Sequence, residues 1–250
     1  MREIEVMEKI ADLGEVFTGS EARIALNMEK GAFYHHIRRL ERDGIIERIA
    51  RNRYMLTFPT KTSPDSFVLA ESMVPESAVA YWSALNYYGM TEQMPGKTYV
   101  ITPVRRNYGR LERYGIRAVI VRENKFFGFR EVRMGGRTVR ITDPEKTVAD
   151  GLDRPGNCGG ILETVKGLSS GVDAETVAEY LRKMGSHAGM KRLGYLCGVL
   201  EIPCPDWVKE EVAKIKGYPL LDPGLERKGR WNTEWGIIVN VPEGYLEEEI

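Results

Sequence analysis

The chain has few cysteines, no long apolar run and no net charge. Its 250 residues include three cysteines, and none of them forms a C-x2-C pair. This argues against a disulfide framework and a structural zinc site, and it favours buried thiols in a reducing compartment. The N-terminus lacks the apolar core of a signal peptide, and no later run reaches membrane-spanning length. We therefore expect a cytoplasmic protein without a membrane partner.

Histidine is also scarce, which limits the catalytic sites that the chain can build. Of the three histidines, His35 and His36 are adjacent, so their side chains point about 100° apart on a helix and cannot chelate one metal ion. No Ser-His-Asp or Cys-His set can be assembled around them. We expect no catalysis, no cofactor and no metal site.

One group of acidic residues with a lysine could suggest a nuclease: Asp143, Glu145, Lys146, Asp150 and Asp153. A restriction-enzyme core, however, needs an acid-x-lysine pair on a strand. Glu145 and Lys146 are adjacent on an expected helix, so their side chains diverge. Asp143 followed by Pro144 is typical of a helix N-terminus, so the sequence favours a structural cap.

The balance of 36 basic and 36 acidic residues hides a segregation of charge. Residues 1–22 hold two basic and six acidic groups, net −4. Residues 23–53 hold eight basic and four acidic groups, net +4. A basic face beside an acidic one indicates that the basic face meets phosphate, as in nucleic-acid binding.

The first sixty residues show the pattern of three helices. Apolar spacing predicts a helix over about residues 2–13. Thr18 with Glu21 three residues later is a capping box that starts a second helix. Asn27 can cap a third helix over about residues 28–43, which Gly44 ends.

The third helix has an apolar face and a basic face. On a helical wheel Phe33, Ile37 and Leu40 fall on one side and must contact the core. The opposite side gathers Gly31, His35, Arg38, Arg39 and Arg42, with Tyr34 at one flank and His36 at the other. We expect His36 to lie at the boundary with the core.

After this helix, two short strands around residues 45–46 and 54–56 flank the basic loop Ala50–Arg53 and predict a wing. Three helices followed by a wing are typical of a winged helix-turn-helix domain, whose third helix enters the major groove. The expected DNA contacts are Lys30, Tyr34, His35, Arg38, Arg39, Arg42, Arg51 and Arg53. The other interpretation is a solvated basic helix in a protein-interaction module.

The rest of the chain reads as a mixed α/β domain. We expect a winged helix-turn-helix domain over residues 1–58, a polar, proline-bounded linker over 59–75, and the α/β domain over 76–250. Strands are predicted at 98–102 and 117–121, and a hairpin around Gly135-Gly136. Helical patterns dominate from 144 to about 216, before a last strand at 236–241. The fold class is α+β.

A second basic segment lies in this part. Residues 97–140 contain twelve basic and three acidic groups, net +9, whereas residues 201–250 have net −5. The two segments could neutralise each other by packing together. Alternatively, the first is a second working surface for nucleic acid or an acidic partner, with Arg105, Arg106 and Arg110 as its candidate residues.

Two blocks carry a resemblance to a known family. The expected winged helix, the segment DPEKTVADGLDRPGNCGG at 143–160 and KRLGYLCGVL at 191–200 together resemble AbiEi-type antitoxins of type IV toxin-antitoxin systems. The resemblance implies a repressor that binds inverted repeats in its own promoter. It also implies a C-terminal domain that counters a nucleotidyltransferase-like toxin without a stable complex. The segment after about residue 205 does not match the family pattern.

We therefore interpret the chain as a DNA-binding transcriptional regulator, an autorepressing antitoxin that is not an enzyme. Two alternatives stay open. A ligand-sensing winged-helix repressor would show an apolar pocket with convergent polar groups. A nucleic-acid-processing enzyme would show clustered carboxylates that bind a divalent metal.

Overall fold

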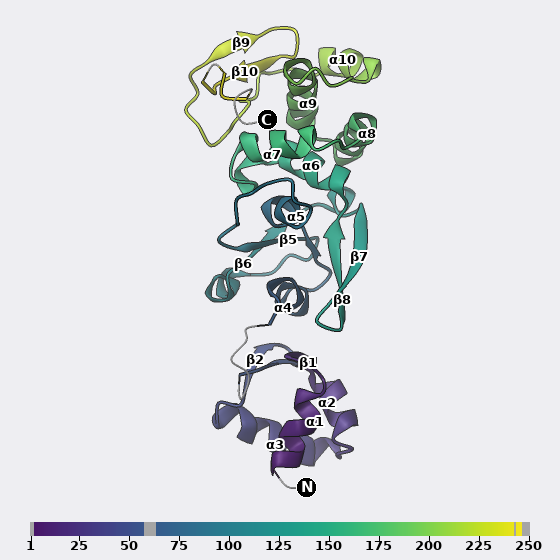
Figure 1. Ribbon diagram of the computed structural model, residues 1–250, viewed down its shortest axis with the longest axis vertical. Coiled ribbons are helices and arrows are strands. Elements are labelled where there is room, and N and C mark those ends of the chain that lie inside the picture. Colours follow the sequence, from purple (N-terminus) through teal and green to yellow (C-terminus); the bar gives the residue numbers. More distant parts are fainter. Residues whose placement is uncertain (1–2, 58–63, 243, 247–250) are drawn as a thin grey trace. The chain divides into compact units, whose positions relative to one another are not determined.

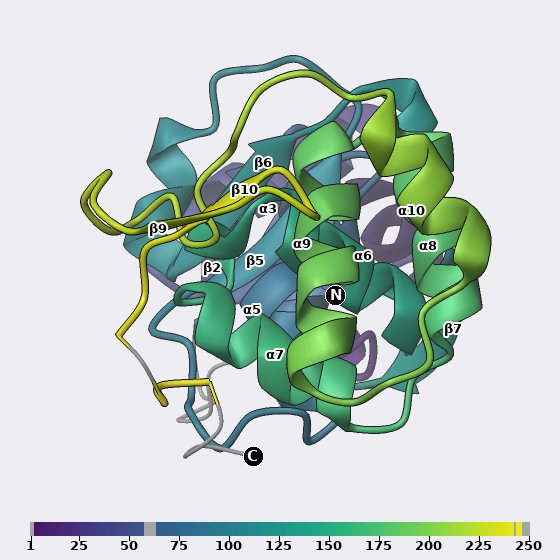
Figure 2. The same ribbon diagram turned by 90° about the horizontal axis from the view of Figure 1, so that it is seen from above.

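The computed structural model describes residues 3–57, 64–242 and 244–246 (Figures 1 and 2). It is an α+β fold with helices and both antiparallel and mixed sheets, so the expected fold class is confirmed at that level. The chain folds into two compact units. Unit 1 comprises Met1–Ser77 and Glu131–Val139, and unit 2 comprises Ala78–Arg130 and Arg140–Ile250.

Unit 1 begins with three helices and a small sheet. The helices are α1 (Glu3–Ala11), α2 (Gly19–Ala25) and α3 (Lys30–Arg42). The strands are β1 (Val16–Thr18), β2 (Ile46–Ala50) and β3 (Arg53–Leu56), in the antiparallel order β1-β3-β2. The three helices and the two later strands are confirmed. The sequence pattern missed β1, because three residues are too short to show an alternation.

The start of α2 is as predicted, and the start of α3 is not. Thr18 accepts a hydrogen bond from the Glu21 N–H at 3.1 Å, and its own N–H donates to Glu21 Oε2 at 2.6 Å, which completes the capping box. The α3 N-cap is Glu29, without a side-chain cap. Asn27 instead adopts a φ of 47° in the α2–α3 turn, a left-handed conformation that asparagine tolerates.

The core of this region is one apolar cluster beneath the helices. Phe33, Ile37 and Leu40 of α3 are each at most 2% exposed, as their spacing predicts. In α1, Val6 and Ile10 are buried and Met7 is half-buried. Because the apolar face of α3 packs into this core, the basic face on the opposite side of the helix points outward.

The expected linker is partly helical. Residues 59–63 of it lie outside the described residues, but α4 spans Ser66–Met73. Asp65 caps α4 by accepting the Phe67 N–H at 2.8 Å. Since α4 buries Val68 and Leu69, the prediction of a simple linker over 59–75 was wrong for this stretch.

The central sheet has five strands in the order β6-β5-β4-β8-β7. They are β4 (Ala78–Val79), β5 (Thr98–Thr102), β6 (Ile116–Ile120), β7 (Phe129–Met134) and β8 (Arg137–Thr142). β5 runs antiparallel to β4 and parallel to β6, while β4 and β8 are parallel. Helix α5 (Tyr81–Tyr87) follows β4. The predicted strands and the Gly135-Gly136 hairpin are confirmed.

Helices dominate the rest of unit 2. They are α6 (Pro144–Asp153), α7 (Ile161–Ser169), α8 (Ala174–Met184), α9 (His187–Val199) and α10 (Asp206–Ala213), followed by the hairpin β9 (Arg230–Asn232) and β10 (Ile237–Val239). In Figure 2, α9 lies between α8 and the β9–β10 hairpin. Short 3₁₀ turns cover Gly109–Tyr114, Glu123–Lys125 and Pro155–Asn157. No helix in the described ranges is long and apolar enough to cross a membrane.

Candidate nucleic-acid interface

Helix α3 carries the basic face that the sequence predicts. Lys30, Tyr34, His35, Arg38, Arg42 and Arg51 are exposed, and Arg39 and Arg53 are half-buried. Tyr34 is 44% exposed and packs edge-on against the buried Phe33, with ring centroids 5.6 Å apart. His36 is half-buried, as expected for a boundary residue. The role of these residues in binding stays a prediction.

One of the exposed arginines has an acidic neighbour. Arg42 Nε lies 3.1 Å from Asp43 Oδ1 at the end of α3, and the side chains are 75% and 37% exposed. An exposed pair of this kind contributes under about 1 kcal/mol and exchanges readily. Arg42 therefore remains able to turn to a phosphate group.

The turn between β2 and β3 is tied to the start of α2. Asn52 has a φ of 58°, and its carbonyl accepts the Gly19 N–H at 3.0 Å. Its side-chain Nδ2 donates to Ser20 Oγ at 3.3 Å. These bonds hold the two-residue turn in place, with Arg51 exposed at its tip. The short β2–β3 hairpin is therefore held against the start of α2.

The two arginines of this turn do not share one environment. Arg51 is exposed, whereas Arg53 is half-buried and pairs across the sheet with Thr18. Arg53 also lines a hollow of about 630 Å³ in unit 1 together with Asp12 and Glu21. Because acidic side chains share this hollow, Arg53 is a weaker candidate for phosphate contact than Arg51.

Two exposed arginines in this region were not among the predicted contacts: Arg23 on α2 and Arg48 on β2. Arg48 lies opposite Tyr54 in the sheet, and its charge acts on that hydroxyl together with Tyr34 of α3. Burial raises the pKa of Tyr54, and Arg48 opposes the rise. Arg48 lies on β2, the strand that packs against α3. Strand alternation places Arg48 on the same face as the buried Ile46, so the sequence pattern gave no sign that it is exposed.

The acidic residues at 143–153 are engaged in structural contacts. Asp143 caps α6 by accepting the Lys146 N–H at 2.7 Å, and it accepts the Tyr180 hydroxyl at 3.1 Å. Asp153 accepts Lys125 Nζ at 2.6 Å and Ser186 Oγ at 2.5 Å. No group of three potential ligands that could hold a metal ion occurs in the described part of the chain. The helix-cap interpretation of Asp143 is confirmed.

Lys146 and Asp150 form an ion pair inside unit 2. Their side chains are 0% and 2% exposed, and the ammonium also lies 5.1 Å from the centre of the Phe127 ring. Burial raises the pKa of Asp150, and Lys146 opposes the rise. Asp150 Oδ2 is buried without a hydrogen-bond partner among the described residues. The pair is therefore a buried charge site that depends on both members.

Eight of the twelve basic residues in the segment 97–140 are exposed. Arg105, Arg106 and Arg110 follow β5 in a solvent-exposed stretch. The ion pairs of this segment include Lys97–Glu112, Lys125–Asp153 and Arg137–Glu21. None of these three pairs involves a residue of the acidic segment 201–250.

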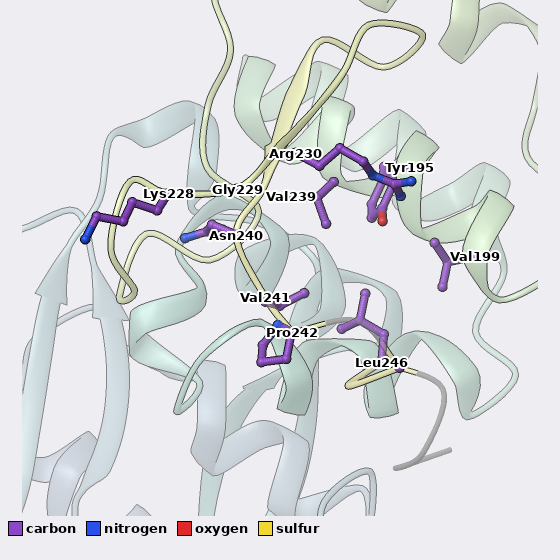
Figure 3. Close-up of a pocket in the computed structure, with 11 residues that line it drawn as sticks. Tyr195, Val199, Lys228, Gly229, Arg230, Val239, Asn240, Val241, Pro242 and Leu246 are labelled. Atoms are coloured by element: carbon purple, nitrogen blue, oxygen red, sulfur yellow. The ribbon is translucent and has the colours of Figure 1, made fainter.

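Unit 2 also contains a hollow of about 530 Å³ beside the β9–β10 hairpin (Figure 3). Its apolar lining comes from Val199, Val239, Val241 and Leu246, and Arg230 and Tyr195 add polar groups. Figure 3 shows Lys228 pointing away from it, where its ammonium pairs with Glu226 at 2.8 Å. Its size suits a small ligand.

No protein-family model matches the chain, and no curated protein is significantly similar to it. Its fold is similar to that of the RV2827C protein from Mycobacterium tuberculosis, known from a crystal structure. The TM-score is 0.69 at 15% sequence identity, over 94% of this chain and 90% of that chain. At this identity the likeness concerns the fold alone.

Proposed function

We propose that residues 3–57 form a winged helix-turn-helix domain that binds double-stranded DNA. The order helix, strand, helix, helix and two-stranded hairpin supports this proposal, with α3 as the helix that enters the major groove. The observation that carries the proposal is the polarity of α3. Its buried face is entirely apolar, and its outer face presents Lys30, His35, Arg38 and Arg42.

The proposed mechanism divides the contacts between phosphate and bases. Arg38 and Arg42, near the second half of α3, supply charge to the groove and its phosphates, and Tyr34 and His35 reach base edges or sugar. Arg51 contacts the backbone from the tip of the hairpin, and Arg48 supports it from β2. Phosphate contacts position the domain, whereas the groove contacts give sequence preference.

We further propose that the protein is an autorepressing antitoxin, acting on a nucleotidyltransferase-like toxin without a stable complex. The resemblance of residues 143–160 and 191–200 to AbiEi-type antitoxins supports this part. Both blocks lie in helices and turns of unit 2, where Lys146, Asp150 and Arg192 are buried. Since these residues support the fold, the antitoxin role rests on surfaces that they hold in place.

The test is binding of a labelled DNA fragment from upstream of the protein's own reading frame, measured by fluorescence anisotropy over a range of salt. The double variant Arg38→Ala, Arg42→Ala should bind clearly more weakly, and the salt slope should fall by about 1 for each phosphate contact removed. The matched control Lys214→Ala, Lys216→Ala removes two exposed charges from unit 2 and should bind normally. Equal affinity of both variants would refute the DNA-binding face.

The hollow of Figure 3 favours a second candidate function, a ligand-sensing repressor. Its mixed lining, in which Arg230 lies beside valine and leucine side chains, suits a small carboxylate that carries an apolar group. Thermal melting with octanoate or benzoate should then show a rise in Tm that Arg230→Gln removes. DNA affinity measured with the same acids must also change, since a bound acid without an effect on DNA binding would contradict a sensing role.

A further inference from the structure

The outer edge of β6 is open. β6 ends the five-stranded sheet on one side, so no described strand pairs with that edge. At its two ends, the Gly115 carbonyl accepts a bond from β5 at 2.7 Å and the Val121 N–H donates to β5 at 3.0 Å. In a parallel pair, every second residue directs both its N–H and its C=O to the same neighbouring strand. The odd-numbered residues between Gly115 and Val121 therefore direct these groups to β5. Ala118 and Ile120 therefore direct their N–H and C=O groups to the open side.

A hollow of about 610 Å³ lies along this edge. Arg117–Ile120 form one part of its lining, which spans about 13 Å at the usual rise per strand residue. The rest comes from the end of α6, the turn Pro155–Asn157, the first part of α9 and Pro223. A strand edge beside a wall of helix ends gives the shape of a groove for an extended chain.

The groove has an excess of positive charge. Arg117, Arg154 and Arg192 line it, and Asp153 is the one acidic residue in the described lining. Asp153 accepts Lys125 Nζ at 2.6 Å, and its Oδ2 also lies 3.6 Å from Arg154 Nε. Lys125, which lies outside the groove, already offsets the charge of Asp153, and the Arg154 side chain is 43% exposed, so its pair with Asp153 is weak and exchanges readily. Arg117 and Arg154 are therefore available to an acidic ligand.

Arg192 is held in the lining of the groove by hydrogen bonds to three backbone carbonyls. Its guanidinium donates to the carbonyls of Leu152 at 2.7 Å, Leu220 at 2.8 Å and Leu221 at 3.0 Å. The residue is 4% exposed, and burial lowers its pKa to about 10, so it stays cationic at neutral pH. The groove therefore combines the guanidinium of Arg192, which its hydrogen bonds fix in position, with a β6 edge that no described strand pairs with.

We propose that this groove binds an extended acidic segment of a partner protein, which adds to β6 as a further strand. Backbone groups of the segment pair with Ala118 and Ile120, as in other cases of strand addition. Its carboxylates lie against Arg117 and Arg154, and its apolar residues contact Ile120, which is 38% exposed. A second copy of β6 fits poorly, because edge-to-edge pairing would bring two Arg117 residues together without an acid between 116 and 120.

The test uses the full chain and three fluorescein-labelled peptides, monitored by anisotropy. The first alternates valine and glutamate over eight residues, and the second replaces each glutamate by lysine. The third is the glutamate peptide with alternate backbone nitrogens methylated, which removes the donors of one edge. The glutamate peptide should bind at least about tenfold more tightly than either of the others, since both charge and ladder bonds contribute.

Two kinds of variant locate the site. Ile120→Pro removes an N–H that makes no bond to β5, and proline is tolerated at such an edge position. Arg117→Gln with Arg154→Gln removes the two exposed charges, and Lys214→Gln with Lys216→Gln is the matched control. The first two variants should each weaken binding of the glutamate peptide by about tenfold at unchanged Tm, and the control should not.

Other results would overturn the proposal. Binding that inorganic phosphate abolishes and Ile120→Pro leaves intact would show an anion site only. A concentration-dependent dimer that Ile120→Pro dissolves, without binding of the glutamate peptide, would show that a second copy occupies the edge. Failure of the glutamate peptide to bind the unmodified protein at 1 mM would also reject it. If Ile120→Pro lowers the Tm, the arginine pair and the methylated peptide still decide between these outcomes.

Discussion

At the scale of the residue, the clearest feature is a charge pair sealed inside unit 2. Lys146 and Asp150 are four residues apart on α6, and neither side chain is more than 2% exposed. The sequence predicted a helical segment that contains both residues, with Asp143 as its cap. It could not show that they are buried, because burial depends on Phe127 and the neighbouring helices. An ion pair in such a place contributes little net stability, but each partner depends on the other.

Removing only one partner should therefore be costly. Lys146→Met leaves Asp150 buried and unpaired, and we expect a loss of about 3–5 kcal/mol in the free energy of unfolding. The double variant Lys146→Met, Asp150→Leu should lose much less than the sum of the two single variants. Urea unfolding of the four proteins measures this coupling. Additive losses would show that the two charges are independent.

Glu21 provides a prediction on pH. Partial burial raises the pKa of its carboxyl group, but hydrogen bonds from the Thr18 N–H and the Arg137 guanidinium outweigh this, so the pKa is lower than usual. The charge therefore stabilises the folded state above about pH 4.5, and this contribution is lost as pH falls through the folded pKa. Since Glu21 is 43% exposed, it amounts to under about 1 kcal/mol.

Glu21→Gln isolates the charge, because glutamine preserves the capping box. In urea unfolding at pH 7 the variant should be slightly less stable than the unmodified protein. The difference should shrink toward pH 3, where Glu21 in the unmodified protein becomes neutral too. A difference that stays constant across this range would mean that the charge of Glu21 does not stabilise the fold.

At the scale of the element, the sequence predicted long periodic segments well and short or context-dependent ones poorly. The helix α3 shows its face through Phe33, Ile37 and Leu40, and β5 and β6 show theirs through apolar runs. β4 and β9 have two and three residues, which is too few for a periodic signal. The segment before α4 is rich in Pro, Thr and Ser, and this composition hides the helix that follows it. Only the burial of Val68 and Leu69 shows that α4 is part of the packed structure.

Helix α9 allows a matched test of packing against propensity. Gly194 and Gly198 are one turn apart on it, and alanine is intrinsically better than glycine in a helix by about 1 kcal/mol. A Cβ at Gly198 would meet open space, whereas a Cβ at Gly194 would overlap the ring of Trp235. Gly198→Ala should raise the free energy of unfolding, and Gly194→Ala should lower it by about 1–3 kcal/mol.

Thermal and urea unfolding of both variants measure the difference. The double variant Gly194→Ala, Trp235→Ala should lose less than the sum of the two single variants, because the overlapping ring is then absent. If Gly194→Ala were as stabilising as Gly198→Ala, the ring of Trp235 would not pack on this helix as described. The comparison needs no activity assay, so it checks the fold independently of function.

At the scale of the whole molecule, a neutral chain carries its charges in blocks. The sequence predicted the blocks by counting, and it predicted the basic face of α3 because a helix has a fixed period. It could not predict which basic residues of 97–140 pair internally, since Lys125 meets Asp153 and Arg137 meets Glu21 only in the folded chain. The stretch that contains Arg105, Arg106 and Arg110 is among the parts that remain exposed.

That stretch is the basis of the last prediction. If this stretch is needed to counter the toxin, a triple variant should no longer rescue growth from the paired toxin. The variant combines Arg105→Glu, Arg106→Glu and Arg110→Glu. Promoter affinity should be unchanged, because the residues of α3 remain in place. The Tm should also be unchanged, because exposed substitutions away from partners usually alter stability by under about 0.5 kcal/mol.

The measurements are growth rescue in cells, with anisotropy and thermal melting of the purified variant. Full rescue by the folded variant would return these arginines to a purely solvating role. Lost rescue with intact DNA binding would instead separate the two activities of one chain, since each would then depend on its own basic surface.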